Sequence, residues 1–164
     1  MPSKSSKKST QVEYNEYVDI VENRYFGNVA GMRFSAVLDC FTEDATVLIY
    51  HGDNQPRHFS RDGKQGDVLI NFFEHLTGNF TARFENFVHY IDPQANRCAS
   101  RFLVTLDPLA DSDYFSNGQQ QLNNCNFFDF RGGLIEHMIV YYSNSRAQSE
   151  TTPTGYPKEG WVKK

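Results

Sequence analysis

The sequence has few cysteines and no long apolar run. Only three of its 164 residues are cysteine (Cys40, Cys98 and Cys125), and none forms a CxxC pair, so a disulfide framework is not expected. No stretch approaches the roughly 20 apolar residues that cross a membrane, and the first residues lack the apolar segment of a secretory signal. These absences predict buried, reduced cysteines and a cytoplasmic protein that does not associate with membranes.

Motifs of several common enzyme classes are also missing. The sequence has no P-loop, no GxGxxG and no Ser/His/Asp nucleophile motif. His75, His89 and His137 lie without the spacing of a metal site, so we expect neither a metal nor another cofactor. The formal net charge of -4 argues against a nucleic-acid partner.

Aromatic residues, in contrast, are abundant. They make up 15% of the chain, with 14 Phe and 9 Tyr but one Trp, which suits a dense core or a hydrophobic cavity. The length is that of one domain with a substantial core. We expect a disordered Ser/Lys-rich tail over residues 1–10, a single domain over residues 11–143 and a loose tail over residues 144–164.

Hydrophobic periodicity predicts three helices. They cover residues 11–30, Phe34 to near Thr42, and Val68 to Leu76. Strands are predicted over residues 45–51, 84–91, 97–106 and the two arms of a hairpin, 119–143, that turns at Gly132-Gly133. Residues 55–64 read as an irregular arm. This order predicts an α+β fold in which about three N-terminal helices pack on a curved, mostly antiparallel sheet.

Four segments carry a family resemblance. Phe41–Val47 (FTEDATV), Asn71–Glu74 (NFFE), Phe127–Ile135 (FFDFRGGLI) and Val140–Tyr142 (VYY) resemble the SnoaL-like branch of the NTF2-like superfamily, over roughly Tyr14 to Ser143. The resemblance implies a cone-shaped sheet around a pocket and a homodimer formed through the outer sheet face. Because the superfamily holds ketosteroid isomerases, polyketide cyclases and non-catalytic modules, it does not settle the function.

The resemblance can be followed residue by residue. Against ketosteroid isomerase, Tyr25 takes the place of the oxyanion-hole tyrosine, the general-base aspartate falls on Ile49 and the protonated aspartate falls on Asn126. Against limonene epoxide hydrolase, the catalytic acid of the last strand falls on Val140. The chain therefore lacks the carboxyl groups with which either family works.

Alternation along the strands, fixed by the same superposition, predicts the inner face of the pocket. It comprises Val47, Ile49, His51, Phe102, Val104, Leu106, Asn124, Asn126, Phe128, Met138, Val140 and Tyr142. Of these, we expect the ligand to contact Asn124, Tyr142, Ile49, Phe102, Phe128, Val140 and Met138. Such a bowl suits a small neutral hydrophobic molecule with one or two oxygens. The opposite parity places Arg101, Phe127 and Tyr141 on the outer face.

Two functions stay open at this point. In the first, a cofactor-free isomerase, cyclase or dehydratase uses His51 to move a proton, while Tyr25 and Asn126 hydrogen-bond a carbonyl or enolate oxygen. In the second, a non-catalytic binding or assembly module uses the same bowl or the outer sheet face. Each candidate also has a structural alternative, since His51 ends a strand and Tyr25 suits a core. Asp53 and His58 are weaker candidates for a segment that closes over the pocket.

Overall fold

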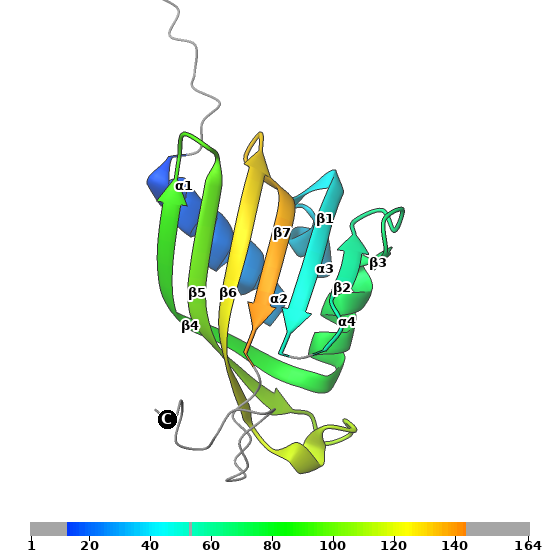
Figure 1. The fold of residues 1–164 in the computed structure, drawn as a ribbon. Helices are drawn as coiled ribbons and strands as arrows, with labels where there is room; N and C mark the ends of the chain where they lie inside the picture. Colours follow the sequence, from blue (N-terminus) through cyan, green and yellow to red (C-terminus); the bar gives the residue numbers. More distant parts are fainter. Residues whose placement is uncertain (1–12, 53, 144–164) are drawn as a thin grey trace, which may run out of the picture.

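The structure is a computed structural model that describes residues 13–52 and 54–143. The two tails expected at 1–10 and 144–164 lie outside the described residues, as does Asp53. The described chain places helices against one face of a single seven-stranded sheet (Figure 1).

The first helical segment runs without a break through α1 (Tyr14–Val18), η1 (Asp19–Phe26) and α2 (Gly27–Ala30). It matches the helix expected from the apolar stripe, which is buried along one side. Its middle part is a π-helix, in which the Gly27 amide donates to the Glu22 carbonyl five residues back. The periodicity gave no sign of this wider turn, a rare form that often occurs at functional sites.

The second helix, α3 (Phe34–Leu38), is shorter than the sequence predicted. The prediction that it continues to Thr42 is wrong, because Phe41 already opens strand β1 (Phe41–His51). Phe41 pairs with Ile135, whose amide donates to the Cys40 carbonyl at 2.8 Å. Pairing with a distant strand therefore overrides the local helical pattern. The third expected helix is α4 (Leu69–Asn79).

The remaining elements are β2 (Arg57–Ser60), β3 (Asp67–Val68), β4 (Phe80–Asp92), β5 (Arg97–Pro108), the short η2 (Phe115–Asn117), β6 (Gln120–Arg131) and β7 (Leu134–Tyr142). The strand order is β3-β2-β1-β7-β6-β5-β4. Only β1–β7 and β2–β3 pair in parallel. The predicted α+β class with a mostly antiparallel sheet is therefore confirmed.

Strand β2 corrects the prediction of an irregular arm over residues 55–64. It pairs with β1 so that Arg57 lies opposite Ile49 and Phe59 lies opposite Val47. The four residues of β2 include the basic side chains Arg57 and His58, so they show too little apolar alternation to predict a strand. The segment becomes a strand because β1 pairs with it. The pairing puts Arg57 and Phe59 on the inner face of the sheet.

The β6–β7 hairpin turns as its sequence predicts. Arg131 pairs with Leu134 across Gly132 and Gly133, which have φ angles of 61° and 79°. Positive φ at both central residues is the type I′ geometry that glycine allows without strain. A bulge between Asp129 and Phe130 then shifts the register of the two strands, and alternate residues of β6 from Leu122 to Phe130 are buried.

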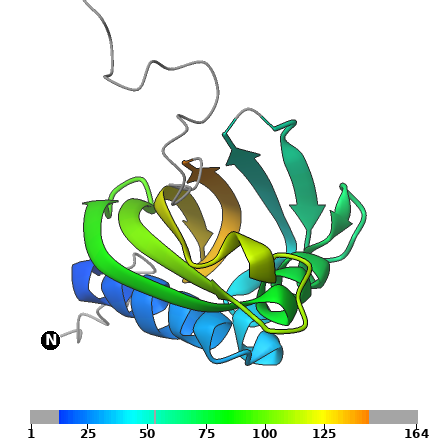
Figure 2. The same cartoon turned by 90° about the horizontal axis from the view of Figure 1, so that it is seen from below.

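The core lies between the helical layer and the sheet (Figure 2). The long strands β4 and β5 bend across the helices, and a bulge between Glu85 and Val88 interrupts their pairing. The other face of the sheet exposes Phe127 and Tyr141, which are 46% and 45% accessible. No helix in the described part of the chain is long and apolar enough to span a membrane.

Candidate functional site

A cavity of about 410 Å³ opens between the inner face of the sheet, α4 and the segment around η2. Its size falls within the range of small-molecule sites. It is lined by Ile49, His51, Asn54, Gln55, Arg57, Phe72, His75, Leu76, Phe80, Phe84, Val104, Leu106, Tyr114, Asn117, Gln120, Leu122 and Tyr142. No Asp or Glu is among these described lining residues.

Three of the expected site residues, His51, Tyr142 and Ile49, line this cavity. His51 and Tyr142 are cross-strand neighbours on β1 and β7. Their ring centroids lie 5.6 Å apart in an edge-to-face arrangement. The pairing of two parallel strands, from opposite ends of the domain, thus brings a potential base and a potential hydrogen-bond donor together.

Burial sets the protonation of both rings. Desolvation lowers the pKa of His51, and the nearby positive charge of Arg57 lowers it further. Burial raises the pKa of Tyr142 to about 12, against opposing effects of Arg57 and Asn124. At neutral pH the His51 imidazole is therefore largely uncharged and can accept a proton, while the Tyr142 phenol keeps its proton and can donate.

Tyr25 lies deeper, on η1, and is not among the lining residues. Its ring is 2% exposed and makes edge-to-face contacts with Phe26, Phe41, Phe73 and Phe128 at centroid distances of 4.6–6.1 Å. Desolvation raises the pKa of its hydroxyl well above the usual value, and Tyr142 contributes in the same direction. The phenol therefore stays protonated behind the cavity wall.

Asn124 and Asn126 also lie behind that wall, on β6, and are 4% and 2% exposed. Asn124 is the cross-strand neighbour of Tyr142. Among the described residues, Oδ1 of Asn126 has no hydrogen-bond partner, and the Asn124 amide has none of normal geometry, although its interaction with the Tyr142 hydroxyl opposes the rise in the Tyr142 pKa. The Asn126 amide nitrogen donates to Met138 Sδ at 3.6 Å. Buried amides without partners are uncommon and call for a ligand, a water or a functional explanation.

The other expected contact residues, Phe102, Phe128, Val140 and Met138, are buried around these asparagines and do not line the cavity. Phe102 packs against Phe26 at 4.5 Å between ring centroids. The structure thus separates the proposed catalytic trio. His51 lines the cavity, while Tyr25 and Asn126 are buried and do not line it.

Sequence reasoning missed several residues that line the cavity. Arg57 was assigned to an irregular arm, and His75 was considered only as a metal ligand. The His75 ring lies 6.1 Å from the Tyr114 ring in an edge-to-face contact. Alternation within Arg57–Ser60 could have placed Arg57 inward if the strand had been recognised. His75 and Tyr114 meet only through the fold. His58, in contrast, lines a shallow depression next to Thr46 and His137 instead of this cavity.

His89 has partners that the sequence did not suggest. Its Nδ1 lies 2.7 Å from Ser100 Oγ, and its Nε2 lies 3.1 Å from Glu22 Oε2. The chain of contacts joins η1 to β4 and β5, and it is outside the cavity lining. Glu22, His89 and Ser100 have the residue types of a nucleophile triad, but Ser100 is fully buried and its hydroxyl is therefore not open to a ligand. No group of three potential metal ligands occurs among the described residues.

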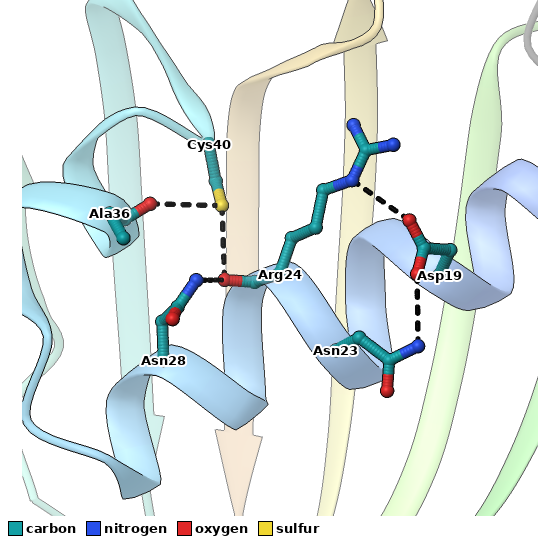
Figure 3. A network of polar contacts seen from close by, with 6 residues as sticks. All are labelled: Asp19, Asn23, Arg24, Asn28, Ala36 and Cys40. Atoms are coloured by element: carbon teal, nitrogen blue, oxygen red, sulfur yellow. Dashed lines mark hydrogen bonds and ion pairs between the residues drawn. The ribbon is translucent and has the colours of Figure 1, made fainter.

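A second network holds the π-helix that carries Tyr25 (Figure 3). The Arg24 carbonyl accepts a hydrogen bond from Asn28 Nδ2 at 2.5 Å and lies 3.3 Å from Cys40 Sγ. The Cys40 thiol is also 3.4 Å from the Ala36 carbonyl. Burial raises the pKa of this thiol to about 11, so it remains a donor. The network ties η1 to α3 and thereby fixes the position of Tyr25. Cys98 is buried, whereas Cys125 is only half-buried, and all three cysteines are free.

No sequence-family model matches the chain, and no curated protein sequence matches it. Solved structures do resemble it. A candidate polyketide cyclase from Xanthomonas campestris is 15% identical, with a TM-score of 0.61 over 78% of this chain and 90% of the other. For an NTF2-like protein from Burkholderia xenovorans the identity is 12%, the TM-score 0.59 and the coverage 80% and 92%. For the BvnE pinacolase of Penicillium brevicompactum these values are 12%, 0.57, 79% and 88%.

At these identities the comparison establishes the fold and leaves the activity open. The match spans most of both chains in each case. The protein therefore has the NTF2-like fold.

Proposed function

We propose that the protein binds a small hydrophobic, oxygenated molecule in the cavity and catalyses a cofactor-free isomerisation, cyclisation or dehydration by acid–base chemistry. The observation that carries this proposal is the meeting of His51 and Tyr142, 5.6 Å apart between ring centroids, on the wall of one cavity of about 410 Å³. Polyketide cyclases and a pinacolase among the structural neighbours are consistent with it.

The two rings suit complementary steps. The uncharged His51 imidazole accepts a proton from carbon next to a ligand carbonyl, and the electrons of the broken C–H bond form an enolate. The Tyr142 hydroxyl donates a hydrogen bond to the enolate oxygen, which is worth more in a desolvated site than in water. The imidazolium then returns the proton at another carbon, so no external oxidant or reductant is needed.

Tyr25, Asn124 and Asn126 support the same chemistry from the buried core. All three side chains are buried, Asn126 Oδ1 has no hydrogen-bond partner among the described residues, and burial keeps the Tyr25 hydroxyl protonated by raising its pKa. A ligand oxygen that reaches past Tyr142 would meet the Asn126 amide and the Tyr25 hydroxyl proposed as donors. Phe102, Phe128, Val140 and Met138 would then form the apolar surroundings of that oxygen.

A non-catalytic role is the second candidate. It is favoured by the lack of any Asp or Glu among the described lining residues, and by Ile49 and Val140 at the positions where related enzymes carry acids. The outer sheet face supports an assembly role, because Phe127 and Tyr141 pack edge to face there at 5.9 Å, and Tyr50 stacks on Tyr141 at 4.9 Å. We propose that this face forms a homodimer.

Exchange of the α-hydrogens of 2-tetralone in D₂O tests the catalytic proposal. This bicyclic ketone is small enough for the cavity, and NMR follows its exchange directly. The wild-type protein should accelerate exchange by about 100-fold over buffer, as expected for a positioned base. His51→Gln should abolish the acceleration, and Tyr142→Phe should reduce it by about tenfold or more.

Arg101→Gln, on the exposed outer face, is the matched control and should leave exchange unchanged. Acceleration that survives in His51→Gln would eliminate the base assignment. Tetralone binding without exchange would favour the binding-module alternative, and no binding would remove the support for either use of the cavity.

A further inference from the structure

The cavity contains one arginine whose charge no protein carboxylate balances in the described structure. The described arginines at positions 24, 83, 97 and 131 each form an ion pair with Asp or Glu, and those at 33 and 61 donate to backbone carbonyls. Only Arg57 and Arg101 lack a hydrogen bond or ion pair within residues 13–52 and 54–143. Arg101 faces solvent on the outer face, whereas Arg57 lines the cavity.

Aromatic rings hold the Arg57 side chain in place. Its guanidinium carbon lies 5.7 Å from the centre of the Phe59 ring and 5.6 Å from that of Phe72. Both rings are buried, and they pack on each other at 5.6 Å. Such contacts fix the plane of a guanidinium but leave its five N–H groups free. Arg57 is exposed, and the two ring contacts restrain its side chain while no acceptor for its guanidinium occurs within residues 13–52 and 54–143.

The surroundings of Arg57 select the kind of acceptor. Asn54, Gln55, Asn117 and Gln120 are the amides that line the same cavity, and they can donate to oxygen without adding charge. His51 is largely uncharged at neutral pH, for the reasons given above. One permanent positive charge beside neutral donors matches a monoanion better than a phosphate dianion. The planar fork of a guanidinium matches the two oxygens of a carboxylate.

We propose that the ligand of this cavity is a carboxylate-bearing hydrophobic molecule, and that its carboxylate pairs with Arg57 at the mouth while its apolar body lies against Phe72, Phe84 and Leu122. This inference rests on the proposed function and replaces the neutral ligand that the sequence suggested. Arg57 is then a specificity residue, which distinguishes an acid from its ester or amide. The body of the ligand reaches inward to His51 and Tyr142, where the reaction takes place.

Two matched probes test the inference: 2-naphthoate and its methyl ester, with affinities measured by calorimetry at pH 7.5 and low salt. Wild-type protein should bind the acid about tenfold more tightly than the ester, the preference expected for one charge-assisted pair in a partly exposed site. Arg57→Gln should bring the two affinities to within about twofold, mainly by weakening the acid. Arg57→Lys keeps the charge without the planar fork and should retain an intermediate preference.

Arg101→Gln should behave as wild type, because that guanidinium lies on the opposite face of the sheet. Equal binding of acid and ester by the wild type, or an unchanged preference in Arg57→Gln, would overturn the assignment to Arg57 while leaving the proposed function standing. Failure of both probes to bind would overturn the proposed use of the cavity, and this inference with it. If Arg57→Gln does not fold, loss of the wild-type preference at 0.5 M salt supports the ion pair, and its persistence opposes it.

Discussion

Replacing Asn124 with leucine should make the protein more stable. The side chain is 4% exposed, and in the described structure neither its nitrogen nor its oxygen has a hydrogen-bond partner of normal geometry, so its interaction with the Tyr142 hydroxyl satisfies it only in part. A buried polar group without a partner costs about 1–3 kcal/mol. Leucine has nearly the same shape and no polar atoms, so Asn124→Leu should increase the free energy of unfolding by about 1–3 kcal/mol.

Thermal unfolding followed by circular dichroism measures this change. For a chain of this size, each kcal/mol shifts Tm by about 2–4 °C, so an increase of about 2–12 °C is expected. Asn123→Leu is the matched control, because Asn123 is the neighbouring residue on the exposed face. That variant should stay within about 0.5 kcal/mol of the wild type.

A lower Tm for Asn124→Leu than for Asn123→Leu would refute the reasoning. It would mean that the amide is satisfied in solution, by a bound water or by the Tyr142 hydroxyl beside it. A gain in stability together with weaker binding of 2-naphthoate would instead identify Asn124 as a residue retained for the ligand at the expense of stability.

Three further predictions concern other parts of the molecule. Cys40→Ala removes the thiol next to the Arg24 carbonyl and should lower the free energy of unfolding, measured by urea titration, by about 1–3 kcal/mol. Cys40→Ser keeps a donor and should lower it by less. Equal losses in the two variants would contradict the hydrogen-bonding role. The pKa of His51, measured by NMR, should lie below 6.5 and rise in Arg57→Gln, because Arg57 is one cause of its depression. The unfolded chain therefore binds the His51 proton more tightly than the folded protein. The free energy of unfolding should rise with pH between the folded pKa and about 6.5 because of His51, and His51→Gln should lack this rise. Phe127→Lys should convert a dimer into a monomer by light scattering, and a monomeric wild type would rule out the homodimer.

Local patterns predicted much of the fold because the relevant signals lie within a few residues. The stripe from Tyr14 to Val29 produced a helix, and Gly132-Gly133 produced the expected two-residue turn with positive φ at both positions. Alternation along β6 and β7, with the parity taken from the family resemblance, correctly placed Asn124, Asn126, Phe128, Met138 and Val140 inward. The turn alone would not have done so, because a bulge between Asp129 and Phe130 shifts the register of the two strands by one residue. Phe127 and Tyr141 were correctly placed on the outer face.

The errors in β1 and β2 share one physical cause, which is pairing between distant segments. Phe41 leaves its helical pattern because Ile135 pairs with it, and Arg57–Ser60 becomes a strand because β1 lies alongside. The π-helix around Glu22 was likewise invisible, because a change in backbone hydrogen bonding leaves the spacing of apolar residues almost unaltered.

The amino-acid sequence by itself determined the elements, the α+β class, the inner and outer faces of the long strands and the resemblance to the NTF2-like fold, because periodicity and turn chemistry act over short distances. Only the tertiary structure decided which inward residues share an open space. It buried Tyr25 and Asn126 away from the cavity that His51 lines, and it brought Arg57, His75 and Tyr114 to that cavity. Depth within a core depends on how whole elements pack, and alternation along one strand carries no information about depth.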